Sequence, residues 1–175
     1  MTISDYKSGL GSHSKDTKLN LSNLFSNVAS SGMTEVQFYG TALSLAYSLN
    51  DKDLIAAVEA EAEGKVEANV VEAAKTAASL MAMNNIYYRF IHLSSDKQFG
   101  KMPAGLRMNA MANPGVDKVD FELYSLAVSV LNGCGMCIDA HVKTLVDNNV
   151  SAQAIQSSAK MAAILNAAKT AYALS

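Results

Sequence analysis

Cysteine, proline and tryptophan are scarce in this chain of 175 residues. There are two cysteines, prolines only at Pro103 and Pro114, and no tryptophan. Two cysteines are too few for the disulfide framework of a small secreted protein, whereas a close pair in a cytosolic protein is more often catalytic or metal-binding. Because proline is nearly absent and half of the residues are apolar, long helices can form with little interruption. We therefore expect an all-α fold.

Neither sign of charge is in clear excess. The chain carries 14 Lys and Arg against 16 Asp and Glu, a net charge of −2, without long runs of one sign. This pattern lacks the basic patch that is typical of nucleic-acid binding. The first 18 residues are polar, and no apolar run approaches the roughly 18 to 20 residues that a membrane span needs. We expect a soluble, cytoplasmic protein with no membrane or nucleic-acid partner.

Helical patterns follow one another along the chain with short breaks. The sequence TEVQ at 34–37 is typical of a helical capping box and precedes an amphipathic run to residue 49. Further helices are predicted over about 67–90, from the NPG turn at 113–115 to just before Gly133, and over 151–173. No alternating pattern is long enough to predict a strand.

The two halves of the chain resemble each other weakly. VQF at 36–38 recurs as VDF at 119–121, and AAKTAA at 73–78 recurs as SAKMAA at 158–163, so the two matches have nearly the same separation along the chain. We expect one domain, residues 1–175, that arose by duplication of a helical unit, with copies at roughly 20–95 and 104–175. Only the second copy contains the cysteines, so the second half should carry the active site.

The stretch NGCGMCIDAH at 132–141 contains both cysteines. On a helix that begins just after Gly133, Cys134, Cys137 and His141 lie within roughly 60° of one another. The free N–H groups and the dipole of a helix N-terminus stabilise a thiolate, the form of cysteine that attacks peroxides and disulfides. His141 is one turn from Cys137 and can exchange a proton with its sulfur.

Glu122 lies in the preceding predicted helix between Phe121 and Leu123, where a carboxylate needs a partner. Such a carboxylate could orient the imidazole of His141. Equally, Glu122 could face solvent beside Ser125 and Ser129, and spacing alone does not decide between these two interpretations.

Three other interpretations of the cysteine pair compete with redox chemistry. A structural zinc site needs four ligands, and the chain could offer only the two cysteines, His141 and a carboxylate. Covalent haem attachment needs histidine directly after the second cysteine, where Ile138 stands. Two inert buried thiols are the simplest alternative. Redox chemistry is favoured, because C-x-x-C at a helix start followed by histidine is less expected by chance than any of these residues alone.

A longer pattern identifies a family. The segment FELYSLAVSVLNGCGMCIDAH, with glutamate twelve residues before C-x-x-C and histidine four after it, resembles the signature of the AhpD alkylhydroperoxidase family. The similarity extends to LRMNAMANPGVDKVDFE at 106–122, to MNNIYYRFIHL at 83–93 and to the total length. It therefore covers essentially the whole chain.

The resemblance implies an internally duplicated all-helical bundle that assembles as a homotrimer. It also implies an antioxidant enzyme with alkyl hydroperoxide reductase activity that reduces the oxidised peroxiredoxin AhpC. The electrons would come from dihydrolipoamide on a lipoylated 2-oxoacid dehydrogenase component, and neither a tightly bound cofactor nor a metal would be needed. The alternative is a non-redox protein of the same helical fold, decarboxylase-like or a binding protein, in which the thiols are incidental.

The resemblance also implies roles for four residues. Glu122 and His141 would form a proton relay, Cys137 would become a sulfenic acid, and Cys134 would be its proton donor and resolving partner through a Cys134–Cys137 disulfide. Met136 stands where some relatives have histidine, but disulfide exchange with AhpC, through Cys137, needs only the residues that remain. The helix N-terminus favours Cys134 as the attacking sulfur, whereas distance to the base favours Cys137, and we weight the base more heavily.

Overall fold

The structure is a computed structural model that describes residues 1–175. It contains nine α-helices, three short 3-10 helices and no strand, which confirms the prediction of an all-α fold. The α-helices are α1 (Ile3–Gly9), α2 (Lys15–Ser26), α3 (Glu35–Leu49), α4 (Lys52–Ala62), α5 (Ala68–Leu93), α6 (Asn109–Ala112), α7 (Lys118–Leu131), α8 (Gly135–Asp147) and α9 (Ala152–Ala173). The 3-10 helices are η1 (Ser12–Ser14), η2 (Val28–Ser31) and η3 (Phe99–Lys101).

The helix ends follow local signals in the sequence. Thr34 and Gln37 form the predicted capping box at the start of α3. The helix predicted from about residue 151 begins where expected, with the side chain of Ser151 as its N-cap. The helix predicted over 67–90 runs slightly further, to Leu93, and two asparagines lie buried in its interior. The predicted helix boundaries are therefore confirmed to within a few residues.

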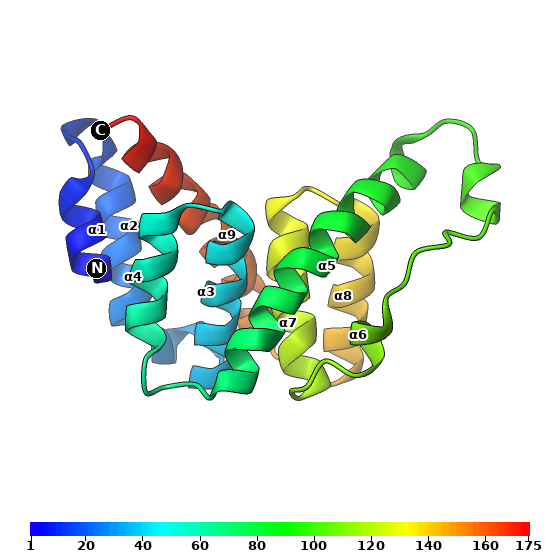
Figure 1. Ribbon diagram of the computed structural model, residues 1–175, viewed down its shortest axis with the longest axis horizontal. Helices are drawn as coiled ribbons and strands as arrows, with labels where there is room; N and C mark the ends of the chain where they lie inside the picture. The colour runs from blue at the N-terminus through cyan, green and yellow to red at the C-terminus, as the bar shows by residue number, and fades with distance from the viewer.

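Helices α3 and α7 pack against each other at the centre of the molecule, and α5, which runs diagonally across them in Figure 1, and α9 pack against both. Gly40 of α3 permits this close approach, because a Cβ atom there would overlap the ring of Tyr124 on α7. The Tyr124 hydroxyl donates a hydrogen bond to the carbonyl oxygen of Val36, at 3.2 Å. One hydrophobic core therefore joins the two halves of the chain.

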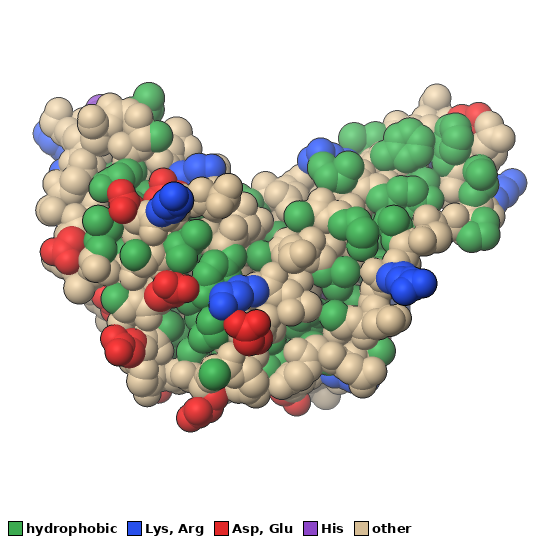
Figure 2. Space-filling model, in the orientation of Figure 1, with side chains coloured by type: hydrophobic (Ala, Val, Ile, Leu, Met, Phe, Trp, Pro, Cys, Tyr) green, Lys and Arg blue, Asp and Glu red, His purple; other side chains and the backbone are tan.

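The second part of α5 extends away from this core (Figure 1). It continues into an extension, residues 94–108, that contains only the short helix η3. Ile86, Phe90 and Leu93 on α5 and Met102 on the extension are exposed, and Figure 2 shows hydrophobic side chains gathered over this arm. No helix has both the length and the apolar character that a membrane crossing requires.

The order of the helices bears on the weak sequence repeat. The starts of α7, α8 and α9 follow those of α3, α4 and α5 at a nearly constant separation along the chain. This separation agrees with that of the two sequence matches. We therefore propose that α3–α5 and α7–α9 descend from one duplicated unit.

Candidate active site

The connection between α7 and α8 fixes the position of Cys134. Gly133 has a left-handed backbone conformation, with a φ of 66°, at the point where α7 ends. The N–H of Gly133 bonds to the carbonyl of Val130, and the N–H of Cys134 bonds to that of Ser129, each at 3.1 Å. This is a Schellman motif, in which glycine tolerates the positive φ. The turn of the chain thus places Cys134 directly at the start of the next helix.

Cys134 and Cys137 are joined by a disulfide across the first turn of α8, with their Cα atoms 5.3 Å apart. Cys134 is the N-cap residue of α8, and its Sγ atom accepts a hydrogen bond from the N–H of Cys137 at 3.3 Å. Cys134 is completely buried, whereas Cys137 remains 7% exposed. Of the two sulfur-bearing residues, Cys137 is therefore the more accessible.

His141 and Glu122 meet between α8 and α7. The Nδ1 atom of His141 lies 2.6 Å from Oε2 of Glu122, and both side chains are largely buried. Ser125 and Ser129, beside which Glu122 was expected if it faced solvent, are themselves fully buried. The solvent-facing interpretation of Glu122 is therefore wrong. The carboxylate instead fixes the ring of His141, so that the other ring nitrogen, Nε2, is left for a different partner.

Polar side chains from α5 hold the α7–α8 connection in place. Arg89 donates a hydrogen bond from Nη1 to the carbonyl oxygen of Asn132 at 2.5 Å. Asn85 accepts a hydrogen bond from Asn132 Nδ2 at 3.0 Å and donates one to Ser129 Oγ at 2.9 Å. The sequence did not predict these roles, because the contacts join positions that are far apart in the chain.

An apolar cavity of about 300 Å³ opens beside Cys137 and His141. Its remaining walls are Met81, Asn84, Tyr88, Met108, Met111, Met136 and Ala140. The sequence did not predict this cavity, whose walls come from α5, α6, α8 and the extension. The only available signal was the abundance of methionine, nine residues in the chain. Methionine is flexible and fills irregular apolar surfaces.

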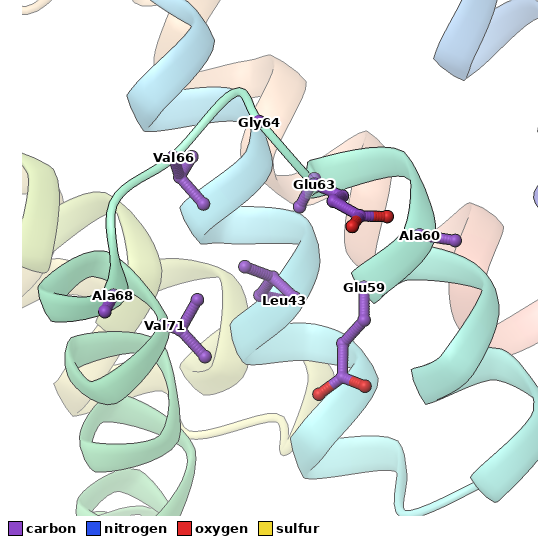
Figure 3. A pocket seen from close by; sticks show the side chains of 9 residues that line it. Leu43, Glu59, Ala60, Glu63, Gly64, Val66, Ala68 and Val71 are labelled. Atoms are coloured by element: carbon purple, nitrogen blue, oxygen red, sulfur yellow. The ribbon is translucent and has the colours of Figure 1, made fainter.

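A larger cavity, of about 440 Å³, lies at the other side of the molecule between α3, α4 and the start of α5. Leu43, Val66 and Val71 line it together with the carboxylates of Glu59 and Glu63 (Figure 3). No cysteine or histidine reaches it. Size alone therefore does not locate the chemistry, and the smaller cavity is the better candidate because it exposes Cys137 and His141. The structure gathers no three His, Cys, Asp or Glu side chains into a metal-binding cluster.

Comparison with known proteins agrees with this geometry. The sequence profile of the Carboxymuconolactone decarboxylase family matches residues 97–175, the part that contains α7, α8 and α9. The chain is 52% identical to "Alkyl hydroperoxide reductase AhpD" of Brucella canis over 171 residues, 98% of this chain and 96% of that protein. It is 49% identical to the protein of the same name from Coxiella burnetii over 164 residues, 94% of this chain and 93% of that one. The chain therefore belongs to the AhpD family.

Proposed function

We propose that this protein is a thiol-dependent peroxidase with alkyl hydroperoxide reductase activity that works in the cytoplasm. The observation that carries the proposal is the Cys134–Cys137 disulfide next to the Glu122–His141 pair, at the wall of an apolar cavity. The names of the relatives in Brucella and Coxiella support it. An alkyl hydroperoxide has an apolar chain and a reactive O–O bond, and the cavity offers an apolar surface beside a thiol and a base.

In the proposed cycle, His141 takes the proton of the Cys137 thiol, and the thiolate attacks the outer oxygen of the hydroperoxide. The O–O bond breaks, the alkoxide receives the proton and leaves as an alcohol, and Cys137 becomes a sulfenic acid. The thiol of Cys134 then attacks this sulfur, water leaves, and the disulfide forms. Glu122 keeps the imidazole of His141 oriented throughout.

The assignment of the attacking sulfur to Cys137 is supported by three features of the site. Cys137 lines the cavity, whereas Cys134 does not. His141 lies one helical turn from Cys137 and lines the same cavity. Cys134 is buried at the N-cap, where it can reach Cys137 across one turn. A peroxide in the cavity would therefore meet Cys137 first.

We further propose that dihydrolipoamide, on a lipoylated 2-oxoacid dehydrogenase component, reduces the disulfide, and that the enzyme passes electrons to oxidised AhpC through a mixed disulfide on Cys137. Two thiols of the dihydrolipoamide become one disulfide as Cys134 and Cys137 regain their protons, so the exchange balances. The apolar cavity beside Cys137 adjoins a second one, about 270 Å³, that shares Tyr88 and Met136 with it. Together they offer a path for an elongated aliphatic group such as the lipoyl arm.

The exposed apolar arm supports the proposed homotrimer. Side chains such as Ile86, Phe90 and Leu93 are between half and three quarters exposed on one chain. Contiguous apolar surface of this kind is typical of a protein–protein interface. Sedimentation equilibrium should therefore give three times the mass of the chain, 18.5 kDa. An Ile86→Lys, Leu93→Lys double variant should shift it to the monomer.

A thiol count tests the enzymatic proposal against the non-redox alternative. The reduced protein should lose both free thiols within one chain when one equivalent of cumene hydroperoxide is added, and dihydrolipoamide should restore them. Oxidised AhpC should be reduced when protein and dihydrolipoamide are both supplied. A decarboxylase-like or binding protein with incidental thiols would keep both thiols after the peroxide is added.

A further inference from the structure

Two consecutive asparagines lie buried in the interior of α5. Asn84 is 5% exposed and Asn85 is fully buried. Asparagine is a poor helix former, and a buried amide costs free energy unless its donors and acceptors are hydrogen-bonded. The burial of each asparagine inside the helix therefore needs a physical explanation.

The burial of Asn85 is explained by hydrogen bonds within the protein. Its amide group donates to Ser129 Oγ and accepts from Asn132 Nδ2, and its Nδ2 also lies 3.8 Å from the sulfur of Met81. These bonds connect α5 with the end of α7, from which the Schellman motif leads to Cys134. Its polar groups are satisfied within the protein, so Asn85 requires no ligand to explain it.

Asn84 has no such partner. Its Oδ1 atom is buried without a hydrogen bond. The residue lines the 300 Å³ cavity together with Cys137 and His141, among walls made mainly of methionine. An amide left unsatisfied in an apolar environment binds strongly to a ligand that completes its hydrogen bonds. Unlike Asn85, Asn84 thus has an unused polar group in the wall of the cavity that Cys137 also lines.

We propose that Asn84 binds the peroxide group of the substrate, while the methionine-rich wall of the cavity takes its alkyl chain. This inference rests on the proposed function and names the group that recognises the substrate. A hydroperoxide has an O–H that can donate to Oδ1 and oxygens that can accept from Nδ2, so it matches both ends of the carboxamide.

The same contact assists the chemical step. When the thiolate of Cys137 bonds to the outer oxygen, the O–O bond breaks and negative charge develops on the inner oxygen. The N–H of Asn84 then donates to this oxygen until the proton held by His141 reaches it and the alcohol leaves. A hydrogen bond that strengthens as charge develops accelerates the reaction more than it strengthens binding.

Asn84→Leu removes the polar group at nearly constant size, and Asn85→Leu is the matched control at the next position. For Asn84→Leu we expect oxidation of the reduced protein by cumene hydroperoxide, followed by stopped flow, to slow by about tenfold or more. Its melting temperature should stay the same or rise, because an unsatisfied buried group is removed. Asn85→Leu should lower the melting temperature, because it removes the hydrogen bonds that the Asn85 amide makes with Ser129 Oγ and Asn132 Nδ2. Asn84→Ala serves as a second variant if Asn84→Leu is destabilised.

Two further rates separate peroxide recognition from a general effect on the thiol. Alkylation of the reduced Asn84→Leu protein by iodoacetamide and reduction of its disulfide by dithiothreitol should equal those of the parent. An unchanged peroxide rate, or equal losses in all three rates, would overturn the role of Asn84. A parent protein that does not react with cumene hydroperoxide would instead overturn the proposed function itself.

Discussion

The α3–α4 and α7–α8 connections share a left-handed residue directly before the N-cap of the next helix, but their side chains differ. In the first, Asn50 has a positive φ of 55°, and Asp51 caps α4 by accepting the N–H of Leu54 at 2.7 Å. In the second, at the equivalent positions, Gly133 has the positive φ and the sulfur of Cys134 accepts the N–H of Cys137. A carboxylate and a sulfur thus occupy equivalent N-cap positions. A left-handed residue followed by an N-cap is thus present in both halves, whereas the bond from the Cys134 N–H to Ser129 that completes the Schellman motif is found only in the second. Only the second half is proposed to use its N-cap for redox chemistry.

The residues around the two N-caps also differ between the two halves of the chain. At the same spacing, Leu54 and Val58, both fully buried, correspond to Cys137 and His141. The position of Glu122 is occupied by Tyr39, whose hydroxyl accepts a hydrogen bond from Lys65. The first half therefore fills the space with apolar side chains where the second has a thiol and an imidazole. The two halves thus share the position of the N-cap, and a few side-chain differences give the second half a thiol and an imidazole there.

The largest expected effect comes from removing the sulfur of either Cys134 or Cys137 at the start of α8. Cys137→Ser should lose nearly all peroxide turnover, by about a thousandfold or more, because no thiolate remains beside His141. Cys134→Ser should accumulate a sulfenic acid on Cys137 under limiting peroxide, because its resolving partner is gone. Mass spectrometry after dimedone labelling locates the adduct. An adduct on Cys134 in the Cys137→Ser protein, formed at the parent's rate, would show that the roles are reversed.

The next largest effect on the rate comes from the Glu122–His141 pair, which has no counterpart in the first half. His141→Gln and Glu122→Gln should each slow thiol oxidation at neutral pH by roughly a hundredfold, the lower range for a general base. Because the carboxylate acts by orienting the ring, the double variant should lose less than the two separate losses combined. Rates from stopped flow, with circular dichroism as the check on folding, decide this. Fully additive losses would indicate that Glu122 acts independently of His141.

The packing between the halves gives a stability effect of intermediate size. Gly40→Ala should destabilise the protein by about 1–3 kcal/mol or more, because the added methyl group would overlap the ring of Tyr124 in a closely packed core. Gly100→Ala is the control, since its new Cβ would meet only Ile91, at an ordinary contact distance of 3.5 Å. Urea unfolding measures both. Equal free energies of unfolding for the two variants would mean that α3 and α7 can separate at little cost.

The sequence predicts the local features of this protein well and the distant contacts less well. The capping box at Thr34, the end of α7 before Gly133 and the helix start at the cysteines depend on neighbouring residues. The Glu122–His141 contact could be proposed, but not decided, because it depends on how two helices are rotated against each other. The Asn84 side chain and the methionine cavity could not be predicted, because their surroundings come from segments far apart in the chain. Periodicity says which face of a helix is buried, but not what it is buried against.

The smallest expected effect on stability concerns Gln37 and Asp120, which occupy equivalent positions in the two halves and contact each other. The amide of Gln37, on α3, donates a hydrogen bond to Oδ1 of Asp120, on α7, at 2.9 Å. Burial raises the pKa of Asp120 above its ordinary value of 3.8, despite this hydrogen bond and the helix N-terminus around it. The folded state therefore holds the proton of Asp120 more tightly than the unfolded state does. Asp120 consequently lowers the stability as pH rises through the range just above 3.8, and the loss remains at neutral pH.

Asp120→Asn keeps the hydrogen bond from Gln37 but removes the charge. It should raise the free energy of unfolding at pH 7 by about a few tenths of a kcal/mol, with no gain near pH 3, where the parent carboxyl is protonated. Asp16→Asn is the control, because Asp16 lies exposed in the first turn of α2 and should lose a similar small amount through the helix dipole. Urea unfolding at pH 3 and pH 7 gives the change in the free energy of unfolding that each variant causes at each pH. Changes of the same sign for the two variants at pH 7 would show that burial does not outweigh the helix N-terminus at Asp120, and that the contact between the two halves leaves its carboxylate well solvated.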